Sequence, residues 1–285
     1  MTVRRPDFAG SWYPDTERRC LEMFRAFEEE CVPREGAGPA RGGIVPHAGW
    51  VFSGRIAYNV IRELARAAEG QVDTVVLFGG HLRPSSPTTI MDRGDFWTPF
   101  GAIPTDEELA RAVCETFDTV TRESPERHTP DNTIELQAPL IRHLLPEAKI
   151  VVIGAPPSDG TLELARGVVA RARDLARNLL VLGSTDLTHY GPNYGWAPKG
   201  LGEEALRWVK EENDARWIEQ ACALDPRAMI DEALSRQNAC CPGAAAAAAE
   251  CARGMGSTEG ELLTYATSAD IRPDASFVGY AGVVL

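Results

Sequence analysis

Short apolar runs that end abruptly at glycine or proline recur along the chain. They include Ile44-Val45, Val75 to Phe78 and Leu179 to Leu182. A strand inside a parallel sheet is covered on both faces, so it forms a continuous apolar run rather than an alternation of apolar and polar residues. The three runs therefore predict buried parallel strands, and each strand is followed by small and polar residues.

Apolar residues at helical spacing separate these strands, and turn residues bound the segments. The predicted helices are about 15 residues after Val51-Phe52-Ser53-Gly54, Ile134 to Leu144, Thr161 to Arg177, Glu203 to Gln220, Pro226 to Arg236 and the six alanines after Gly243; the further strands are Lys149 to Ile153, Leu262 to Thr267 and Phe277 to Val284. Alternating strands and helices are typical of α/β proteins. We therefore predict one three-layer α/β domain over residues 1–285.

The segment between residues 89 and 132 is less regular. Thr89 to Met91 and Asp95 to Thr98 flank a turn-forming Asp92-Arg93-Gly94, a pattern that predicts a β-hairpin. Thr105 to Glu108 has the pattern of a capping box and predicts the start of a helix. Thr121 to Asn132 is polar and predicts a surface loop.

Composition and charge narrow the classes of function. The net charge of -12 disfavours a nucleic-acid or anionic-membrane surface, which requires a basic patch. No signal-peptide core or membrane-spanning apolar run is visible, so we expect a cytoplasmic protein with a small-molecule ligand. Seven irregularly spaced cysteines without a CxxC pair indicate neither a disulfide framework nor a conventional zinc motif. The sequence does not indicate an oligomeric state.

Three of the five histidines lie just beyond predicted strands, namely His47, His81 and His189. Ligands of open α/β sheets bind beyond the carboxyl ends of the strands. A lone histidine at such a place is more often structural, but His47 and His81 have matching contexts that favour a shared site. Neutral imidazole binds iron, zinc, copper or nickel, so the sharper hypothesis is a metal centre.

Other polar residues near the predicted strand ends have alternative interpretations. Asp186 could orient His189 or accept its ring proton, or it could cap the loop while His189 packs against Tyr190. Glu135 lies at a helix start, where the helix dipole alone favours a carboxylate. Cys240 and the cysteine after it precede the alanine helix, a position that favours a thiolate ligand or nucleophile, although two buried thiols are equally compatible with the pattern.

Two common chemistries lack their motifs. The chain contains no GxSxG sequence for a serine hydrolase, and neither GxGxxG nor GxxxxGK[ST] for phosphate binding. The remaining histidines, His128 in a polar loop and His143 on a predicted helix, are expected to lie outside the site.

Six motifs in sequence resemble the Memo family, which includes the AmmeMemoRadiSam system protein B. The motifs are Ala9-Gly10-Ser11-Trp12-Tyr13-Pro14, Pro46-His47-Ala48-Gly49, Phe78-Gly79-Gly80-His81, Trp97-Thr98-Pro99-Phe100-Gly101, Ile134-Glu135 and Ser184-Thr185-Asp186-Leu187-Thr188-His189-Tyr190-Gly191. The family is similar in fold to class III extradiol dioxygenases, which are non-haem iron enzymes that open catechol rings. The resemblance implies a mixed central sheet flanked by helices and a metal-binding pocket.

The resemblance also implies roles for individual residues. His47 and His81 match the two imidazole ligands of the family. Its cysteine ligand, four residues before a proline, falls on Asn238 here, so either Asn238 or the nearby Cys240 is expected as the third ligand. A family histidine is replaced by Asn132.

The activity implied by the resemblance is an oxidoreductase of the dioxygenase type acting on a small aromatic or other substrate. The expected metal is Fe(II), with copper or zinc as alternatives. His189, Asp186 and Glu135 are the expected catalytic residues. The alternatives are a non-enzymatic metal-binding or redox-responsive protein, and a degenerate scaffold that binds a partner or a small ligand.

Overall fold

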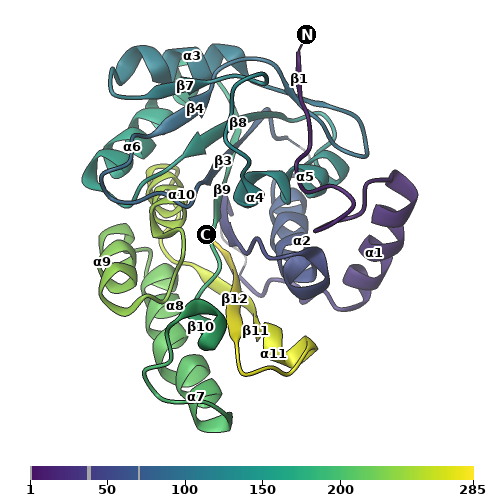
Figure 1. Ribbon diagram of the computed structural model, residues 1–285. Helices are drawn as coiled ribbons and strands as arrows, with labels where there is room; N and C mark the ends of the chain where they lie inside the picture. Colours follow the sequence, from purple (N-terminus) through teal and green to yellow (C-terminus); the bar gives the residue numbers. More distant parts are fainter. Residues whose placement is uncertain (1, 37–39, 70) are drawn as a thin grey trace.

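The computed structural model describes residues 2–36, 40–69 and 71–285, in which strands and helices alternate (Figure 1). The strands are β1 (Val3–Arg4), β2 (Gly42–Val45), β3 (Thr74–Gly79), β4 (Thr89–Met91), β5 (Asp95–Phe96), β6 (Ile103–Pro104), β7 (Thr121–Glu123), β8 (Lys149–Gly154), β9 (Leu179–Ser184), β10 (His189–Tyr190), β11 (Glu261–Thr267) and β12 (Phe277–Val284). The α-helices are α1 (Glu17–Glu29), α2 (Trp50–Ala67), α3 (Glu107–Thr116), α4 (Asn132–Glu135), α5 (Ala138–Leu144), α6 (Asp159–Asp174), α7 (Glu203–Trp208), α8 (Asp214–Cys222), α9 (Pro226–Arg236), α10 (Pro242–Gly254) and α11 (Ser268–Ile271). None of the helices in this part of the chain has the length and apolar character needed to cross a membrane.

The main sheet is mixed. Across the described ranges it has nine strands in the order β10, β12, β2, β9, β3, β8, β4, β7, with β11 paired to β12. β2, β9, β3 and β8 are parallel, whereas β12 runs antiparallel to β2 and β4 antiparallel to β8. The carboxyl ends of β2, β9 and β3 therefore lie side by side at one edge.

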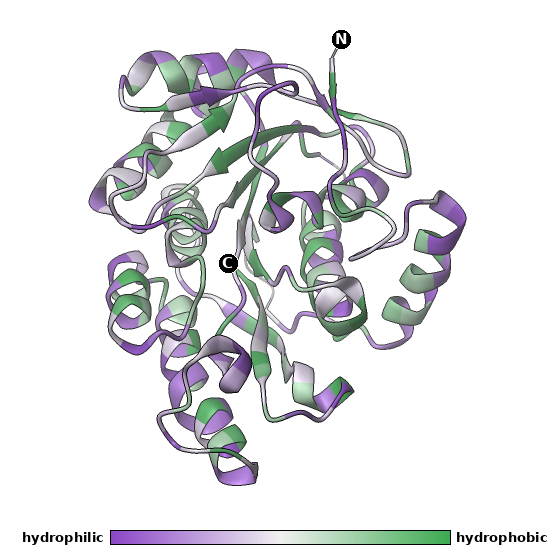
Figure 2. Ribbon diagram, viewed as in Figure 1, coloured by the Kyte–Doolittle hydropathy of each residue, from purple (hydrophilic) through white to green (hydrophobic). Residues whose placement is uncertain are grey.

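Side chains of the central strands alternate between two apolar cores. In β3, Val75 and Leu77 join the core with α1, α2 and α5, whereas Val76 and Phe78 join the core with α3, α6 and α10. Figure 2 shows the central strands as the most hydrophobic part of the ribbon. Because both faces of the sheet are covered, these strands are apolar throughout. The predicted three-layer α/β architecture is confirmed.

The alanine-rich helix α10 lies unusually close to the sheet. Its six alanines, residues 244–249, are fully buried. On β9, a Cβ atom added to Gly183 would lie 2.6 Å from the carbonyl oxygen of Ala244. Small side chains on both surfaces therefore permit backbone-to-backbone packing. This packing brings the residues before α10, Cys240 and Cys241, to the carboxyl edge of the sheet.

The predicted hairpin over residues 89–98 is wrong, because its two strands belong to different sheets. β4 pairs with β8 and β7 in the main sheet, whereas β5 pairs with β1 and β6 in a separate three-stranded sheet. Gly94, at φ +85°, redirects the chain between them, and the Asp95 N–H donates to the carbonyl of Thr2. The partner that captures β5 is thus the N-terminal segment, far away in sequence.

Three other predictions on the middle of the chain need correction. Residues 121–132 are not all loop, since the polar edge strand β7 pairs in parallel with β4. The helix predicted over 134–144 is two short helices, and Pro139 stands in the first turn of the second. The cap of α3 is Asp106, whose carboxylate accepts the Leu109 N–H, whereas Thr105 forms a bridge with Ile150.

Asp106 also links three parts of the fold. Its buried carboxylate accepts hydrogen bonds from the Thr74 hydroxyl at 2.6 Å and from Nε of Arg177 at 3.0 Å, besides the Leu109 N–H at 3.2 Å. Burial opposes ionisation of Asp106, but these hydrogen bonds together hold its pKa below the usual value. The start of β3, the start of α3 and the segment after α6 are therefore joined through one carboxylate.

We predict that Asp106→Ala lowers the free energy of unfolding by about 3 kcal/mol at neutral pH, because a buried charge pair and a helix cap are lost together. Asp106→Asn should cost less, since asparagine also caps helices. The depressed pKa of the folded state adds stability that is present above the unfolded pKa, at about 4. That stability is lost as the pH falls through the pKa of Asp106 in the folded protein. Urea unfolding at neutral and acidic pH measures it, and an effect of Asp106→Asn that does not shrink in acid would contradict this account.

Candidate metal centre

Three candidate residues share one position relative to their strands. His47, Asp186 and His81 each lie two residues beyond the carboxyl end of their strands, which are β2, β9 and β3 respectively. These strands are parallel neighbours with β9 in the middle. The equal offset and the shared register place all three residues at the same edge of the sheet.

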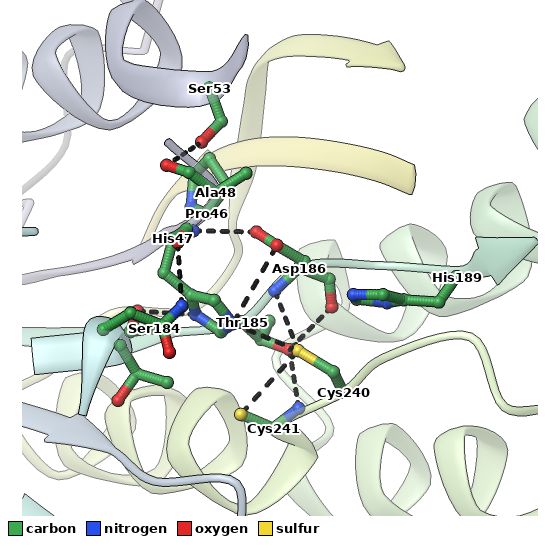
Figure 3. A network of polar contacts seen from close by, with 12 residues as sticks. Pro46, His47, Ala48, Ser53, Ser184, Thr185, Asp186, His189, Cys240 and Cys241 are labelled. Carbon is green, nitrogen blue, oxygen red and sulfur yellow. Dashed lines mark hydrogen bonds and ion pairs between the residues drawn. The ribbon is translucent and has the colours of Figure 1, made fainter. Parts of the chain in front are cut away.

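Two thiols approach this edge from the α10 side. Donor atoms of His47, His81, Cys240 and Cys241 all lie within 4.8 Å of one another. The Sγ atom of Cys240 is 3.3 Å from Nε2 of His47 and 3.7 Å from Sγ of Cys241 (Figure 3). The two imidazole rings have centroids 5.0 Å apart and are nearly perpendicular, at 79°.

The separations in this cluster suit a transition metal. A tetrahedral centre with metal–sulfur bonds of about 2.3 Å and metal–nitrogen bonds of about 2.0 Å has sulfur–sulfur and sulfur–nitrogen separations of about 3.8 and 3.5 Å. The observed values of 3.7 and 3.3 Å are close to these. Imidazole and thiolate are both common ligands of first-row metals. The residues present therefore fit a metal ion.

Cys240 has the environment of a thiolate. Burial opposes its ionisation, but hydrogen bonds from Cys241, His47 and His81 and the charge of His47 lower the pKa of Cys240 well below the usual value. The backbone N–H of Asp186 also donates to its sulfur at 3.3 Å. Burial and the adjacent Cys240 thiolate raise the pKa of Cys241. Cys240 is thus the stronger ligand of the pair, because the thiolate is the form that binds metals.

His47 is held through its ring and through its backbone. Its Nδ1 lies 3.0 Å from Oγ of Ser184, and its backbone N–H donates to Asp186 at 2.7 Å. Burial alone would lower the pKa of His47, but the negative charges of Asp186 and Cys240 raise it to about 9. In the absence of a metal, the raised pKa of His47 and the lowered pKa of Cys240 favour an imidazolium–thiolate pair here. A bound metal would replace the ring proton, since only neutral imidazole is a ligand.

His189 lies beside the cluster, and its ring points toward Asp186 in Figure 3. No hydrogen bond joins these two side chains among the contacts of the described residues. Instead, Nδ1 of His189 lies 3.1 Å from the carbonyl oxygen of Leu187, and the ring packs edge-on against Tyr194. A carbonyl can only accept a hydrogen bond, so Nδ1 carries the proton and neutral His189 presents Nε2 as an acceptor.

Glu135 is not brought into the cluster. Its carboxylate accepts hydrogen bonds from the backbone N–H groups of Asp7 at 2.7 Å and Phe8 at 2.8 Å, and from the hydroxyl of Tyr13 at 3.0 Å. Both carboxylate oxygens are therefore used to hold the N-terminal segment against α4. This geometry gives Glu135 a structural role.

Asn238 also lies outside the cluster. It is fully buried, and its side-chain amide donates to the carbonyl of Asn213 at 2.8 Å. Asn213 in turn donates to the hydroxyl of Thr188 at 2.9 Å. Asn238 therefore supports the loop that carries Asp186, while the sulfur of Cys240 lies within the cluster. The expected ligand set did not include Cys241. The sequence feature that could have indicated it is its position next to Cys240, just before a helix.

A cavity of about 640 Å³ opens over the imidazole side of the cluster. His47, His81, Asp186 and His189 line it, together with Asn132, whose side-chain amide donates to the carbonyl of His47. The two cysteines do not line it. Its volume is typical of sites that bind small molecules.

The fold and this cluster define an α/β protein with a candidate metal centre at the carboxyl edge of its sheet, beneath a cavity for a small ligand. The family model described as "Memo-like protein" matches residues 4–284. The chain therefore belongs to the Memo family, and the resemblance carried by the six motifs is confirmed.

Relatives of similar length support this assignment. The chain is 31% identical to a MEMO1 family protein of Pyrococcus abyssi, over 99% of each chain. It is 33% identical to family proteins of Thermococcus kodakarensis, over 99% of each, and of Methanopyrus kandleri, over 99% of this chain and 98% of the relative. An uncharacterised protein of Escherichia coli K12, at 12% identity, shares the fold with a TM-score of 0.53 over 86% of this chain and 98% of that one.

We predict that Glu135→Gln lowers the free energy of unfolding by about 2 kcal/mol, because hydrogen bonds to a charged acceptor are each worth roughly 1.5–3 kcal/mol. Amide hydrogen exchange at Asp7 and Phe8 should accelerate, while the amount of bound metal stays unchanged. Tyr13→Phe is the milder control, since it removes only one of the three donors. Unaltered exchange at both amides in Glu135→Gln would contradict the structural role.

Proposed function

We propose that the protein binds one first-row transition metal through His47, His81 and Cys240, and that this centre acts on a small molecule bound in the cavity. The observation that supports the proposal most directly is the convergence of two imidazoles and a thiolate at the base of a cavity of small-molecule size. The proposed reaction type is an oxidation of the kind carried out by class III extradiol dioxygenases.

The proposed metal is iron(II), which two imidazoles and one anionic ligand would hold with open coordination positions for substrate and dioxygen. Copper and zinc are the competing ions, because thiolate ligands favour them. Such a centre would supply Lewis-acid and redox chemistry to the bound ligand.

The surrounding residues divide the remaining tasks. His189 is the proposed base, because Nδ1 is committed to the Leu187 carbonyl and Nε2 is free to accept a proton from a ligand. Asp186 accepts a hydrogen bond from the His47 backbone N–H at 2.7 Å. Burial raises the pKa of Asp186, and the nearby His47 and His189 oppose that rise. Asn132 fixes the His47 loop, but its amide cannot transfer a proton. Among the described residues, His189 is the one imidazole besides the two proposed ligands that lines the cavity.

A second function is favoured by one further observation. Cys241 has its sulfur 3.7 Å from that of Cys240, so it could complete a set of two cysteines and two histidines. Four protein ligands close a tetrahedral site and leave no position for substrate. In that arrangement the protein would be a non-enzymatic metal-binding or redox-responsive protein.

We predict that protein purified without oxygen contains metal in near-stoichiometric amount, and that His47→Ala and His81→Ala each remove it. Elemental analysis measures the metal content. His143→Ala is the matched control, because His143 packs against Phe24 and Phe100 away from the cluster. Wild-type protein that stays free of metal after anaerobic reconstitution with iron, copper or zinc would overturn the proposal.

Substitution with cobalt distinguishes the open site with three protein ligands from the closed site with four. The thiolate-to-cobalt absorption in the near ultraviolet grows with the number of bound thiolates. We predict that Cys240→Ser abolishes this absorption and that Cys241→Ser leaves it nearly unchanged. A loss of about half the absorption in each variant would instead support the closed four-ligand site, and with it the non-enzymatic function.

A further inference from the structure

Part of the cavity wall, outside the metal cluster, is formed by the C-terminal part of the chain. Residues of α11 and of the loop before β12 line it, as do the N-terminal end of α2 and the segment at Ser11 and Trp12. The aromatic side chains of Trp12, Phe52, Tyr194 and Tyr280 line the cavity and give it flat apolar surface. Such surface suits a planar ligand.

One full positive charge lies on this wall. Arg272 is the single arginine or lysine among the described residues that line the cavity, in a protein whose net charge is -12. It is solvent-exposed, and the carboxylic acids of the same lining are Asp186 and Asp274. Among the described residues of this lining, Arg272 is therefore the one side chain that carries a permanent positive charge.

The acids next to Arg272 in sequence are engaged elsewhere. Asp270 accepts the Lys210 ammonium at 2.6 Å and both the N–H and the hydroxyl of Thr267 at 2.7 and 2.9 Å. Asp274 accepts the N–H of Ser276 at 3.3 Å. Across residues 2–36, 40–69 and 71–285, no carboxylate forms an ion pair with Arg272, so its guanidinium donors face the cavity mouth or solvent.

The local backbone adds to the same electrostatic preference. The N-terminal end of α2, an 18-residue helix, contributes Gly49, Val51 and Phe52 to the lining. The positive end of a helix dipole favours an anionic group nearby. A guanidinium binds a carboxylate through two parallel hydrogen bonds, which makes it selective for that group.

We propose that the cavity binds a small planar molecule that bears a carboxylate, with the carboxylate paired to Arg272 at the mouth and the planar part against the aromatic wall. Arg272 is then the residue that sets specificity for anionic over neutral ligands. The inference rests on the proposed function, because it names the ligand class of the same cavity. It assigns recognition to a residue on the wall formed by α11 and the following loop, outside the metal cluster.

The test compares two ligands of nearly equal shape, 2-naphthoate and the neutral 2-naphthamide, by fluorescence titration of the metal-loaded protein. We expect the wild type to bind the carboxylate about tenfold more tightly, in the range of one charge-assisted pair. Arg272→Gln should remove this preference while binding of the amide stays the same. Arg25→Gln, which removes an equal charge from the exposed side of α1, should keep it.

Equal binding of the two ligands by the wild type, binding of neither, or a preference that survives in Arg272→Gln would overturn the inference. Repeating the titration with His47→Ala, which lacks one proposed metal ligand, separates it from the metal proposal, since a carboxylate can also bind a metal ion directly. A preference for the carboxylate in protein that never binds metal would refute the metal centre and leave the role of Arg272 standing. Bound metal without a preference for the carboxylate would support the metal centre and refute the role of Arg272.

Discussion

The close packing of α10 on the sheet is the constraint on which the site depends. A helix normally stands off a sheet by the thickness of its side chains, but here alanines meet Gly183, and a single added Cβ on that glycine would approach the Ala244 carbonyl to 2.6 Å. The first residues of α10 therefore reach the level of the strand ends. Without this approach, the thiols of Cys240 and Cys241 would lie too far from the histidines to share an ion.

The second requirement is that opposite charges remain together where water is excluded. His47 and Asp186 are buried, and Cys240 is partly buried beside them. Burial favours the protonated thiol, but the neighbouring His47 imidazole and the Cys241 thiol lower the pKa of Cys240, and the backbone N–H of Asp186 also donates to its sulfur. The strand register sets the positions of the histidines, and the charges then hold the loops in place. Fold and site are thus stabilised by the same contacts.

Much of this arrangement could be predicted from the sequence, because its determinants are local. Continuous apolar runs identified β2, β3 and β9, and the histidines just beyond them followed from the geometry of parallel strands. The failures depend on contacts between distant segments. The partner of β5 is a strand at the N-terminus, and the donors to Glu135 are backbone groups of Asp7 and Phe8. Likewise, the partner of Asn238 is the carbonyl of Asn213, 25 residues earlier in the chain, which no local pattern indicates.

The site is asymmetric, and the asymmetry has a chemical consequence. The imidazoles of His47 and His81 border the cavity, whereas both sulfurs lie on the far side, beneath α10 and away from the lining. A ligand or oxidant entering the cavity therefore meets the imidazoles, because neither cysteine is part of the cavity lining. Thiolates are the more easily oxidised ligands. In the proposed metal centre, this placement would let a soft anionic ligand hold the metal from the packed side while the imidazole side stays open to the cavity.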